Sequence, residues 1–335
     1  MSGAGPHRPA GPHRPANPPR PTDPRSPRRD APGLLAWLAV AAVLFALAPP
    51  PPPIPLLGED EPLVLARQLE RTIAAARRWQ AVRGDLTIPW EDARGHLALV
   101  IDDVGRELHL FDQLLALRHR LTFAVLPGAV YASGVQLRLR ADRRRPRDIL
   151  LHLPMEPRRA DAMDAERAAG EVFLQVGDPP EVLREKTAAA LRRVPAAVGV
   201  SNHMGSALTT DLTALSAVMA ELGARDLFFL DSVTVPGSRG AAAAAEAGIP
   251  AISRDFFLDH DPSPEAIREQ LRRAAERARE APTVAIAHPS QAVVDILRDE
   301  LPRLHAAGIA IYPLHELLAR TSASRPAPAG APLPH

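Results

Sequence analysis

Between residues 95 and 320, short apolar runs alternate with segments of helical periodicity, and this alternation constrains the fold more than any other feature of the sequence. A short apolar run bounded by polar or turn residues is typical of a buried strand, and strands that alternate with helices predict a parallel sheet with outer helices. The predicted strands are 97–101, 121–126, 149–153, 197–200, 227–230, 250–253, 284–287 and 309–312. The predicted helices are 107–118, 180–193, 212–222, 264–280 and 291–307.

The number of these units limits the architectures that the chain can adopt. Seven or eight units over about 215 residues are close to the smallest set that closes into a (β/α) barrel. An open doubly wound sheet is the alternative that this pattern leaves open. The closely mixed acidic and basic residues of this region give no nucleic-acid footprint. Cysteine is absent, so any bound metal needs His, Asp or Glu ligands.

The segments outside this region have a different composition. Residues 1–32 carry a repeated GPHRPA and few apolar side chains, which predicts disorder because too little surface can be buried to offset chain entropy. The predicted organisation is a disordered tail at 1–32, a membrane segment at 33–48, a Pro-rich linker with a lead-in helix (61–82) at 49–94, the main domain at 95–320 and a second disordered tail at 321–335.

The uncharged run GLLAWLAVAAVLFALA, residues 33–48, predicts a membrane-targeting element. Its length lies between that of a signal-peptide core and that of a spanning helix. The prolines that follow disfavour cleavage, so we expect an uncleaved transmembrane anchor rather than a cleaved signal peptide or a buried core helix. Six arginines and two aspartates precede the run. The positive-inside bias therefore predicts an inner-membrane protein whose main domain is periplasmic.

Polar residues follow most of the predicted strands. The carboxyl ends of parallel strands gather at one rim, where active sites of such folds are built, so these residues are expected to converge. Taken singly, each has an ordinary structural explanation, such as a helix N-cap for an Asp or a satisfied buried His. Together they predict a functional rim that contains Asp102 and Asp103, Pro127 and Gly128, His152, Asn202 and His203, Asp231 and Ser232, Arg254 and Asp255, and His288.

The adjacent Asp102 and Asp103 indicate which chemistry such a rim supports. Two like charges side by side are tolerable when a cation offsets their repulsion. One carboxylate then binds a divalent metal beside imidazole ligands, while the other takes a proton from water. A His at the rim is the usual acid for a leaving group. Covalent serine catalysis is disfavoured, because neither Ser206 nor Ser232 lies in a G-x-S-x-G elbow.

Seven motifs resemble, in this order, those of the divergent polysaccharide deacetylases, a bacterial envelope group related to the metal-dependent carbohydrate esterases. They are VIDDVG, LTFAVLPG, HLPMEP, GVSNHMGS, FFLDSVT, RDFFLD and IAHP, and the resemblance covers residues 97–318. It implies a deformed (β/α) barrel of about seven strands, with a parallel sheet inside outer helices. It also implies one divalent metal ion, of the Zn type, at the rim.

The resemblance also implies roles for individual residues. In the related esterases, the first Asp of the pair is the base, the second binds the metal, and the His that ends the last catalytic strand is the general acid. These roles fall on Asp102, Asp103 and His288.

Two departures from the esterases affect the rest of the site. The esterases carry two metal histidines four residues apart, whereas here His152 is followed at that spacing by Glu156, and His203 comes from the next strand. Their Arg-Pro-Tyr substrate motif is replaced by NHMGS. The expected metal ligands are therefore Asp103, His152 and His203, with Glu156 as a fourth or water-mediated ligand.

The expected function is that of a metal-dependent hydrolase that removes N-acetyl groups from an envelope polysaccharide such as peptidoglycan. Asp231 and Arg254 are supporting candidates that would orient the base, bind the sugar, or pair to stabilise the strand ends. The altered motifs leave open a catalytically inactive envelope binding or scaffold protein that retains the barrel. A metal-dependent phosphoesterase is disfavoured, because the rim lacks a Gly-rich anion cradle.

Overall fold

The structure is a computed structural model that describes residues 86–143, 145–159 and 161–323. The tail predicted at 1–32, the membrane segment predicted at 33–48 and the lead-in helix predicted at 61–82 lie outside the described residues. Within the described residues, no helix is long and apolar enough to cross a membrane. Residues 321–323, which were predicted to begin the C-terminal tail, instead complete the last helix.

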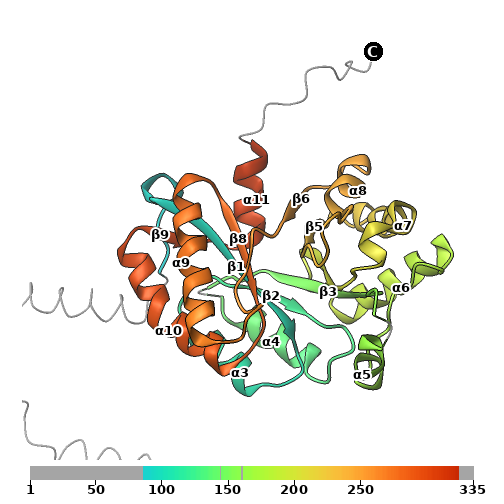
Figure 1. Cartoon of the computed structure of the whole chain (residues 1–335), viewed down its shortest axis with the longest axis horizontal. Helices are drawn as coiled ribbons and strands as arrows, with labels where there is room; N and C mark the ends of the chain where they lie inside the picture. The colour runs from blue at the N-terminus through green and yellow to red at the C-terminus, as the bar shows by residue number, and fades with distance from the viewer. Residues whose placement is uncertain (1–85, 144, 160, 324–335) are drawn as a thin grey trace, which may run out of the picture. The chain divides into compact units, whose positions relative to one another are not determined.

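In the part of the chain that the structure describes, nine parallel strands form one sheet, and the order of the strands follows the chain (Figure 1). The order is β6-β5-β4-β3-β2-β1-β8-β7, and β9 pairs with the start of β1. This order has no reversal point, so it excludes a doubly wound sheet and confirms the barrel-like fold. The strands are β1 (Gly95–Val104), β2 (Thr122–Val125), β3 (Ile149–Met155), β4 (Gly199–Met204), β5 (Phe228–Asp231), β6 (Ala251–Ser253), β7 (Phe256–Phe257), β8 (Thr283–Ala287) and β9 (Ile309–Ile311).

One split strand position joins the two sides of the sheet. Strand β6 pairs with β5, strand β7 pairs with β8, and only Arg254 and Asp255 separate β6 from β7 in the chain. The N–H of Arg254 donates to the carbonyl of Asp231, and that of Asp255 donates to the carbonyl of Val284. When β6 and β7 are counted as one strand position, the barrel-like sheet has about seven positions, as expected. The two-residue strand β7 was not predicted.

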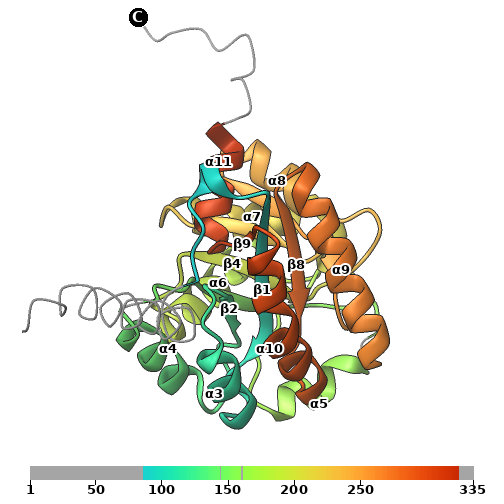
Figure 2. The same cartoon turned by 90° about the vertical axis from the view of Figure 1, so that its left-hand side faces the viewer.

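Helices cover the outside of the sheet (Figures 1 and 2). The helices are α3 (His109–Ala116), α4 (Ala132–Ala141), α5 (Ala162–Ala168), α6 (Pro180–Arg193), α7 (Leu212–Gly223), α8 (Gly240–Glu246), α9 (Pro264–Glu280), α10 (Gln291–Ala306) and α11 (Leu314–Ala323), with short 3-10 turns at Trp90–Asp92 and Leu208–Thr210. Helices α6 and α9 match their predicted bounds, because a proline at the first turn marks where each begins. Helices α4, α5, α8 and α11 were not predicted.

Successive residues of each strand face two separate cores. In β1, Leu99 and Ile101 belong to the large core that the strands form with the outer helices. Ala98 and Val100 belong to a smaller core to which helices α3 to α10 contribute no buried residue, as expected for the inside of the barrel. This alternation is the period-two geometry of a strand, and it turns Asp102 to the same side as Ala98 and Val100.

Helix α11 lies at the amino ends of the strands. Leu314 and Leu317 are fully buried in the inner core. The N–H of Leu314 donates to the hydroxyl of Thr122, the first residue of β2, at 3.0 Å. The N–H of His315 donates to the carboxylate of Asp148, just before β3, at 2.7 Å. This helix therefore covers the amino end of the barrel, opposite the rim where the polar residues were predicted.

Folding stability should fall below neutral pH because of a buried histidine, His119. Burial, with the neighbouring His305 and Arg147, lowers the pKa of its ring to about 4. In the unfolded chain, His119 takes up a proton near pH 6.5. The folded state therefore loses stability as the pH falls from about 6.5 towards 4. The free energy of unfolding should fall by roughly 2 kcal/mol between about pH 7.5 and pH 5. Urea unfolding of the wild type and of His119→Leu at these two pH values measures the effect. An identical pH dependence in the two proteins would contradict it.

Candidate active site

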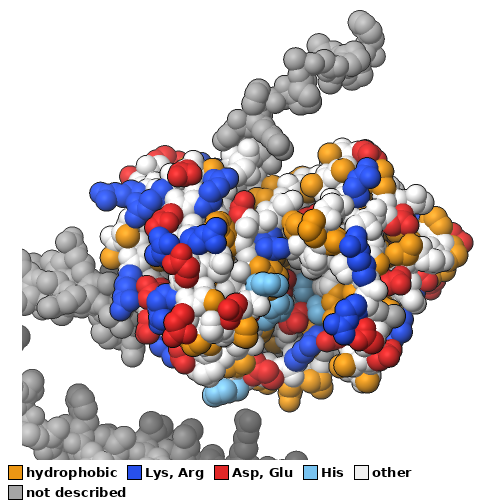
Figure 3. Space-filling view, in the orientation of Figure 1, with side chains coloured by type: hydrophobic (Ala, Val, Ile, Leu, Met, Phe, Trp, Pro, Cys, Tyr) orange, Lys and Arg blue, Asp and Glu red, His pale blue; other side chains and the backbone are white. Residues whose placement is uncertain are grey.

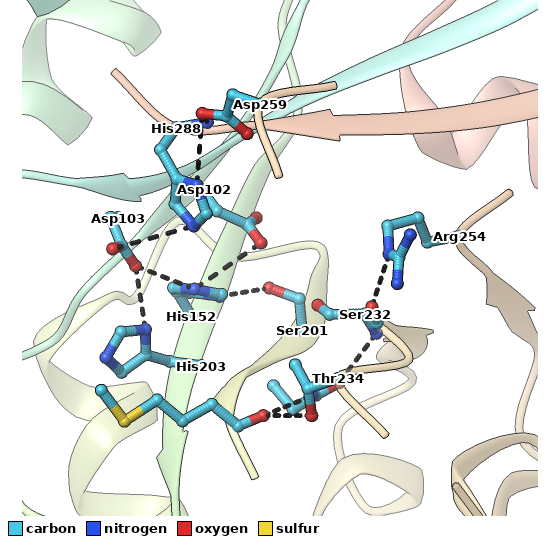
Figure 4. Close-up of polar contacts among 12 residues, drawn as sticks. Asp102, Asp103, His152, Ser201, His203, Ser232, Thr234, Arg254, Asp259 and His288 are labelled. Carbon is cyan, nitrogen blue, oxygen red and sulfur yellow. Dashed lines mark hydrogen bonds and ion pairs between the residues drawn. The ribbon is translucent and has the colours of Figure 1, made fainter. Parts of the chain in front are cut away.

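Five of the predicted rim residues come together at the carboxyl ends of the strands (Figure 4). Asp102 and Asp103 lie near the end of β1, His152 lies in β3, His203 lies in β4, and His288 directly follows β8. Strand alternation turns Asp102 and the three histidines away from the outer core. In the space-filling view, histidine side chains occupy a hollow that has charged side chains around it (Figure 3).

Asp103 departs from this alternation. In a regular strand, the adjacent side chains of Asp102 and Asp103 would point to opposite faces. The pairing of β1 with β2 shifts register between Ile101 and Val104, and Asp103 has a φ of 55°. A bulge re-aims a side chain, and a left-handed backbone at a non-glycine residue costs on the order of 1 kcal/mol or more. The irregular backbone therefore brings both carboxylates to the same site.

Three side-chain atoms converge as the ligands of a small cation do. Oδ1 of Asp103 lies 3.1 Å from Nε2 of His152 and 2.9 Å from Nδ1 of His203. Each of the three residues offers one ligand atom within 4.8 Å of the other two. Ligands at about 2.0–2.1 Å from a tetrahedral zinc ion are separated by about 3.3 Å. The spacing and the chemistry of this donor set therefore fit a zinc-type cation.

Ser201 fixes the orientation of His152. Nδ1 of His152 forms a 2.8 Å hydrogen bond with Oγ of Ser201, and both side chains are buried. This contact leaves Nε2 facing Asp103. Hydrogen bonds to the second ring nitrogen commonly orient metal-binding histidines and set their tautomer.

Asp103 and His203 shift each other's protonation strongly. Burial by itself would raise the pKa of Asp103, but the close contacts with the rings of His152 and His203 hold that pKa well below its usual range. Burial would lower the pKa of His203, but the neighbouring carboxylates of Asp103 and Glu166 raise it to about 9. A cation bound here must displace a proton from His203, so cation binding should weaken as pH falls.

Asp102 is buried beside this donor set. Its side chain is almost fully buried, and its Oδ1 has no hydrogen-bond partner among the described residues. Its Oδ2 lies 3.7 Å from Nε2 of His152. Burial raises the pKa of Asp102, and the nearby His152 and His288 only partly oppose that rise. A carboxylate with a raised pKa and a free oxygen is suited to accept a proton.

His288 faces Asp103 from the other side of the site and pairs with Asp259. Its Nδ1 lies 3.3 Å from Oδ2 of Asp259, and its backbone N–H donates to the same oxygen at 2.8 Å. Its Nε2 lies 4.0 Å from Oδ2 of Asp103. Burial lowers the pKa of His288, but the hydrogen bond to Asp259 and the charge of Asp103 raise it overall. The ring is therefore readily protonated and is placed to donate a proton from Nε2.

Glu156 is not brought into the donor set. Among the described residues, the group that could hold a metal ion consists of Asp103, His152 and His203 and does not include Glu156. The carboxylate of Glu156 instead accepts a 2.7 Å hydrogen bond from the N–H of Val176. The residue at the four-residue spacing after His152 therefore stabilises a neighbouring loop.

Asp231 and Arg254 stabilise the loop after β5 and form no ion pair with each other. Asp231 accepts hydrogen bonds from the N–H of Val233 at 2.9 Å and from the hydroxyl of Ser238 at 2.7 Å. Arg254 donates to the carbonyls of Ser232 at 2.6 Å and Val233 at 2.7 Å. Val233 has a φ of 46°, which is strained for a β-branched residue. These contacts stabilise the strand ends. Burial lowers the pKa of Arg254 and the charge of Asp102 partly opposes this, so Arg254 also lies within electrostatic range of the predicted base, and its role there stays a prediction.

Sequence reasoning assigned no role to Ser201, Asp259 or Glu166. A signal for Ser201 existed, because it lies two residues before His203 and therefore on the same face of the strand. A signal for Asp259 also existed, because it is the last residue of RDFFLD, one of the seven motifs that carry the family resemblance. Glu166 had no such signal, because its helix α5 was not predicted.

A family model described as divergent polysaccharide deacetylase matches residues 99–318. The chain belongs to the divergent polysaccharide deacetylase family. The protein YibQ of Escherichia coli K12, described as uncharacterized, is 35% identical over 205 residues, which are 61% of this chain and 61% of YibQ. A Haemophilus influenzae protein, also described as uncharacterized, is 32% identical over 213 residues, which are 63% of this chain and 73% of that protein. The match therefore spans about three fifths of the length of YibQ.

The fold of this deacetylase-family chain is similar to that of a solved structure. The uncharacterized protein ATU2773 from Agrobacterium tumefaciens C58 aligns with a TM-score of 0.60 and 24% identity, over 69% of this chain and 93% of that protein. At this identity the likeness concerns the fold alone. The family match confirms the resemblance that the seven motifs indicated.

Replacing Asp259 by Asn should lower the pKa of the His288 ring. The substitution keeps the size of the side chain but removes the negative charge that stabilises the protonated imidazole. An NMR titration of the His288 ring in the wild type and in Asp259→Asn measures this shift. The ring signal of the exposed His109, on α3, serves as the internal reference, because its side chain contacts Gln113. An unchanged pKa for His288 would show that Asp259 does not govern its protonation.

Proposed function

We propose that this protein is a metal-dependent hydrolase that removes N-acetyl groups from an envelope polysaccharide such as peptidoglycan. The convergence of Asp103, His152 and His203 beside the buried Asp102 is the observation that carries the proposal. Membership of the deacetylase family supports the choice of an acetylated polysaccharide as substrate. A divalent cation held by the three ligands would polarise the acetamide carbonyl and lower the pKa of a water molecule.

The protein's own groups supply the proton transfers. Asp102 takes a proton from the water that attacks the acetamide carbonyl, and its raised pKa makes it a stronger acceptor than an exposed carboxylate. His288, protonated with the help of Asp259, donates a proton to the departing nitrogen. The new C–O bond forms when water adds to the carbonyl, and the C–N bond breaks when the resulting tetrahedral adduct expels the protonated nitrogen, so the products are acetate and a free amine on the sugar.

The proposed substrate is compatible with the location expected from the sequence. The apolar run at 33–48 and the arginines before it support a location of the main domain on the periplasmic side of the inner membrane. We therefore propose that the enzyme acts on glycan at the outer face of that membrane. Protease accessibility of the domain in spheroplasts, compared with intact cells, would test this location.

Zinc binding should require His203. The purified wild type should bind about one equivalent of zinc, and His203→Ala should lose most of it, because one of the three protein ligands is removed. His109→Ala is the matched control, since His109 is exposed on α3 and is not part of the donor set. Metal content after dialysis measures the effect. Equal zinc content in the wild type and His203→Ala would exclude His203 as a ligand.

Deacetylation should depend on Asp102 without a matching loss of metal. Asp102→Asn should keep bound zinc, because Asp102 is outside the ligand set, and should lower acetate release by about 100-fold or more, as expected when a general base is removed. Acetate release from N-acetylglucosamine polymers measures the rate. If the wild type binds zinc, releases no acetate from such glycans, and Asp102→Asn still complements a deletion strain, a non-catalytic binding or scaffold function replaces this proposal.

A further inference from the structure

His203 makes polar contacts through both of its ring nitrogens. Its Nδ1 lies 2.9 Å from Oδ1 of Asp103, on the side where the ligand atoms converge. Its Nε2 is buried and makes no hydrogen bond within the described residues, and Oε2 of Glu166 faces it as an ion-pair partner at 3.5 Å. If Nδ1 binds a cation, Nε2 must carry the ring proton. The carboxylate of Glu166 is then the acceptor that faces this proton.

Glu166 reaches His203 from outside the strands that build the rest of the site. It lies on the short helix α5, which follows β3, and its side chain is mostly buried. The guanidinium of Arg106 donates a hydrogen bond to the same oxygen, Oε2, that faces His203. Arg106 lies only three residues after Asp103, in the loop that follows β1. The end of β1 and the loop after it therefore supply both a proposed metal ligand and the residue that holds Glu166.

These contacts form a closed chain of side chains around one ligand. Asp103 contacts His203, His203 contacts Glu166, Glu166 contacts Arg106, and the backbone returns from Arg106 to Asp103. Without Glu166, the ring of His203 would still be packed by aromatic neighbours, the rings of His152 at 5.0 Å and Phe173 at 6.3 Å between centroids. It would lose the anionic contact at Nε2, while the contact of Nδ1 with Asp103 would remain.

We propose that Glu166, held by Arg106, is a positioning residue that fixes the orientation and tautomer of His203, so that Nδ1 is presented to the metal. This inference rests on the proposed metal-dependent function. It assigns a role to helix α5, which lies outside the motifs at the strand ends. A carboxylate that accepts from the outer nitrogen of a metal-binding histidine increases the basicity of that ligand, and losing such a partner typically costs about 10-fold to 100-fold in metal affinity.

The test compares zinc affinities of the purified protein by competition with a chromophoric chelator. Glu166→Ala should raise the dissociation constant for zinc by about 10-fold to 100-fold, because the acceptor is removed. Glu166→Gln should raise it less, because the amide oxygen still accepts the Nε2 proton without the negative charge. Asp164→Asn is the matched control: it removes the same charge from the same helix, and its 79% exposed side chain contacts Arg167 rather than His203.

A second readout separates positioning from a general loss of stability. In the zinc-loaded wild type, ¹⁵N NMR should show the His203 ring protonated at Nε2, and Glu166→Ala should move or broaden this signal while the signal of His152 keeps its position. Unchanged zinc affinity in Glu166→Ala, or an equal loss in Asp164→Asn, would overturn the inference. If the wild type itself binds no zinc, the proposed metal-dependent function fails as well, so the two failures can be told apart.

Discussion

The contacts of one carboxylate, Asp103, with two histidines from neighbouring strands are the interaction on which the site depends. Oδ1 of Asp103 lies within about 3 Å of both His152 and His203. This geometry is reached only because the backbone of β1 is irregular at Asp103, where φ is 55° and the register with β2 shifts. Burial raises the pKa of Asp102, and the charge of the adjacent Asp103 adds to that rise, so the two carboxylates would be unfavourable here without positive charge beside them.

The regular parts of the fold could be predicted from the sequence because they follow from periodicity. Short apolar runs gave eight of the nine strands, and proline at the first turn located the beginnings of α6 and α9. The rule that carboxyl ends of parallel strands share a rim brought together Asp102, His152, His203 and His288 from distant parts of the chain. Strand alternation also explains why these side chains turn inward.

The features that the sequence did not reveal depend on tertiary contacts or on local departures from regular geometry. A two-residue strand such as β7 has no periodicity of its own, and it is defined only by its pairing with β8. The bulge at Asp103 follows from how β1 pairs with β2, which no local pattern encodes. From its spacing to His152, Glu156 was expected to be a fourth or water-mediated ligand, but its carboxylate accepts a hydrogen bond from the N–H of Val176 instead. Glu166 was missed because α5 buries only one residue, Met163.

The central claim is that Asp103, His152 and His203 hold a catalytic cation, and anomalous X-ray diffraction tests it most directly. Crystals grown with zinc and measured on both sides of the zinc absorption edge should show a strong anomalous peak at about 2.0–2.1 Å from Oδ1 of Asp103, Nε2 of His152 and Nδ1 of His203. A peak at that position is the predicted result. No peak there at saturating zinc, or a zinc ion bound by other residues, would contradict the claim.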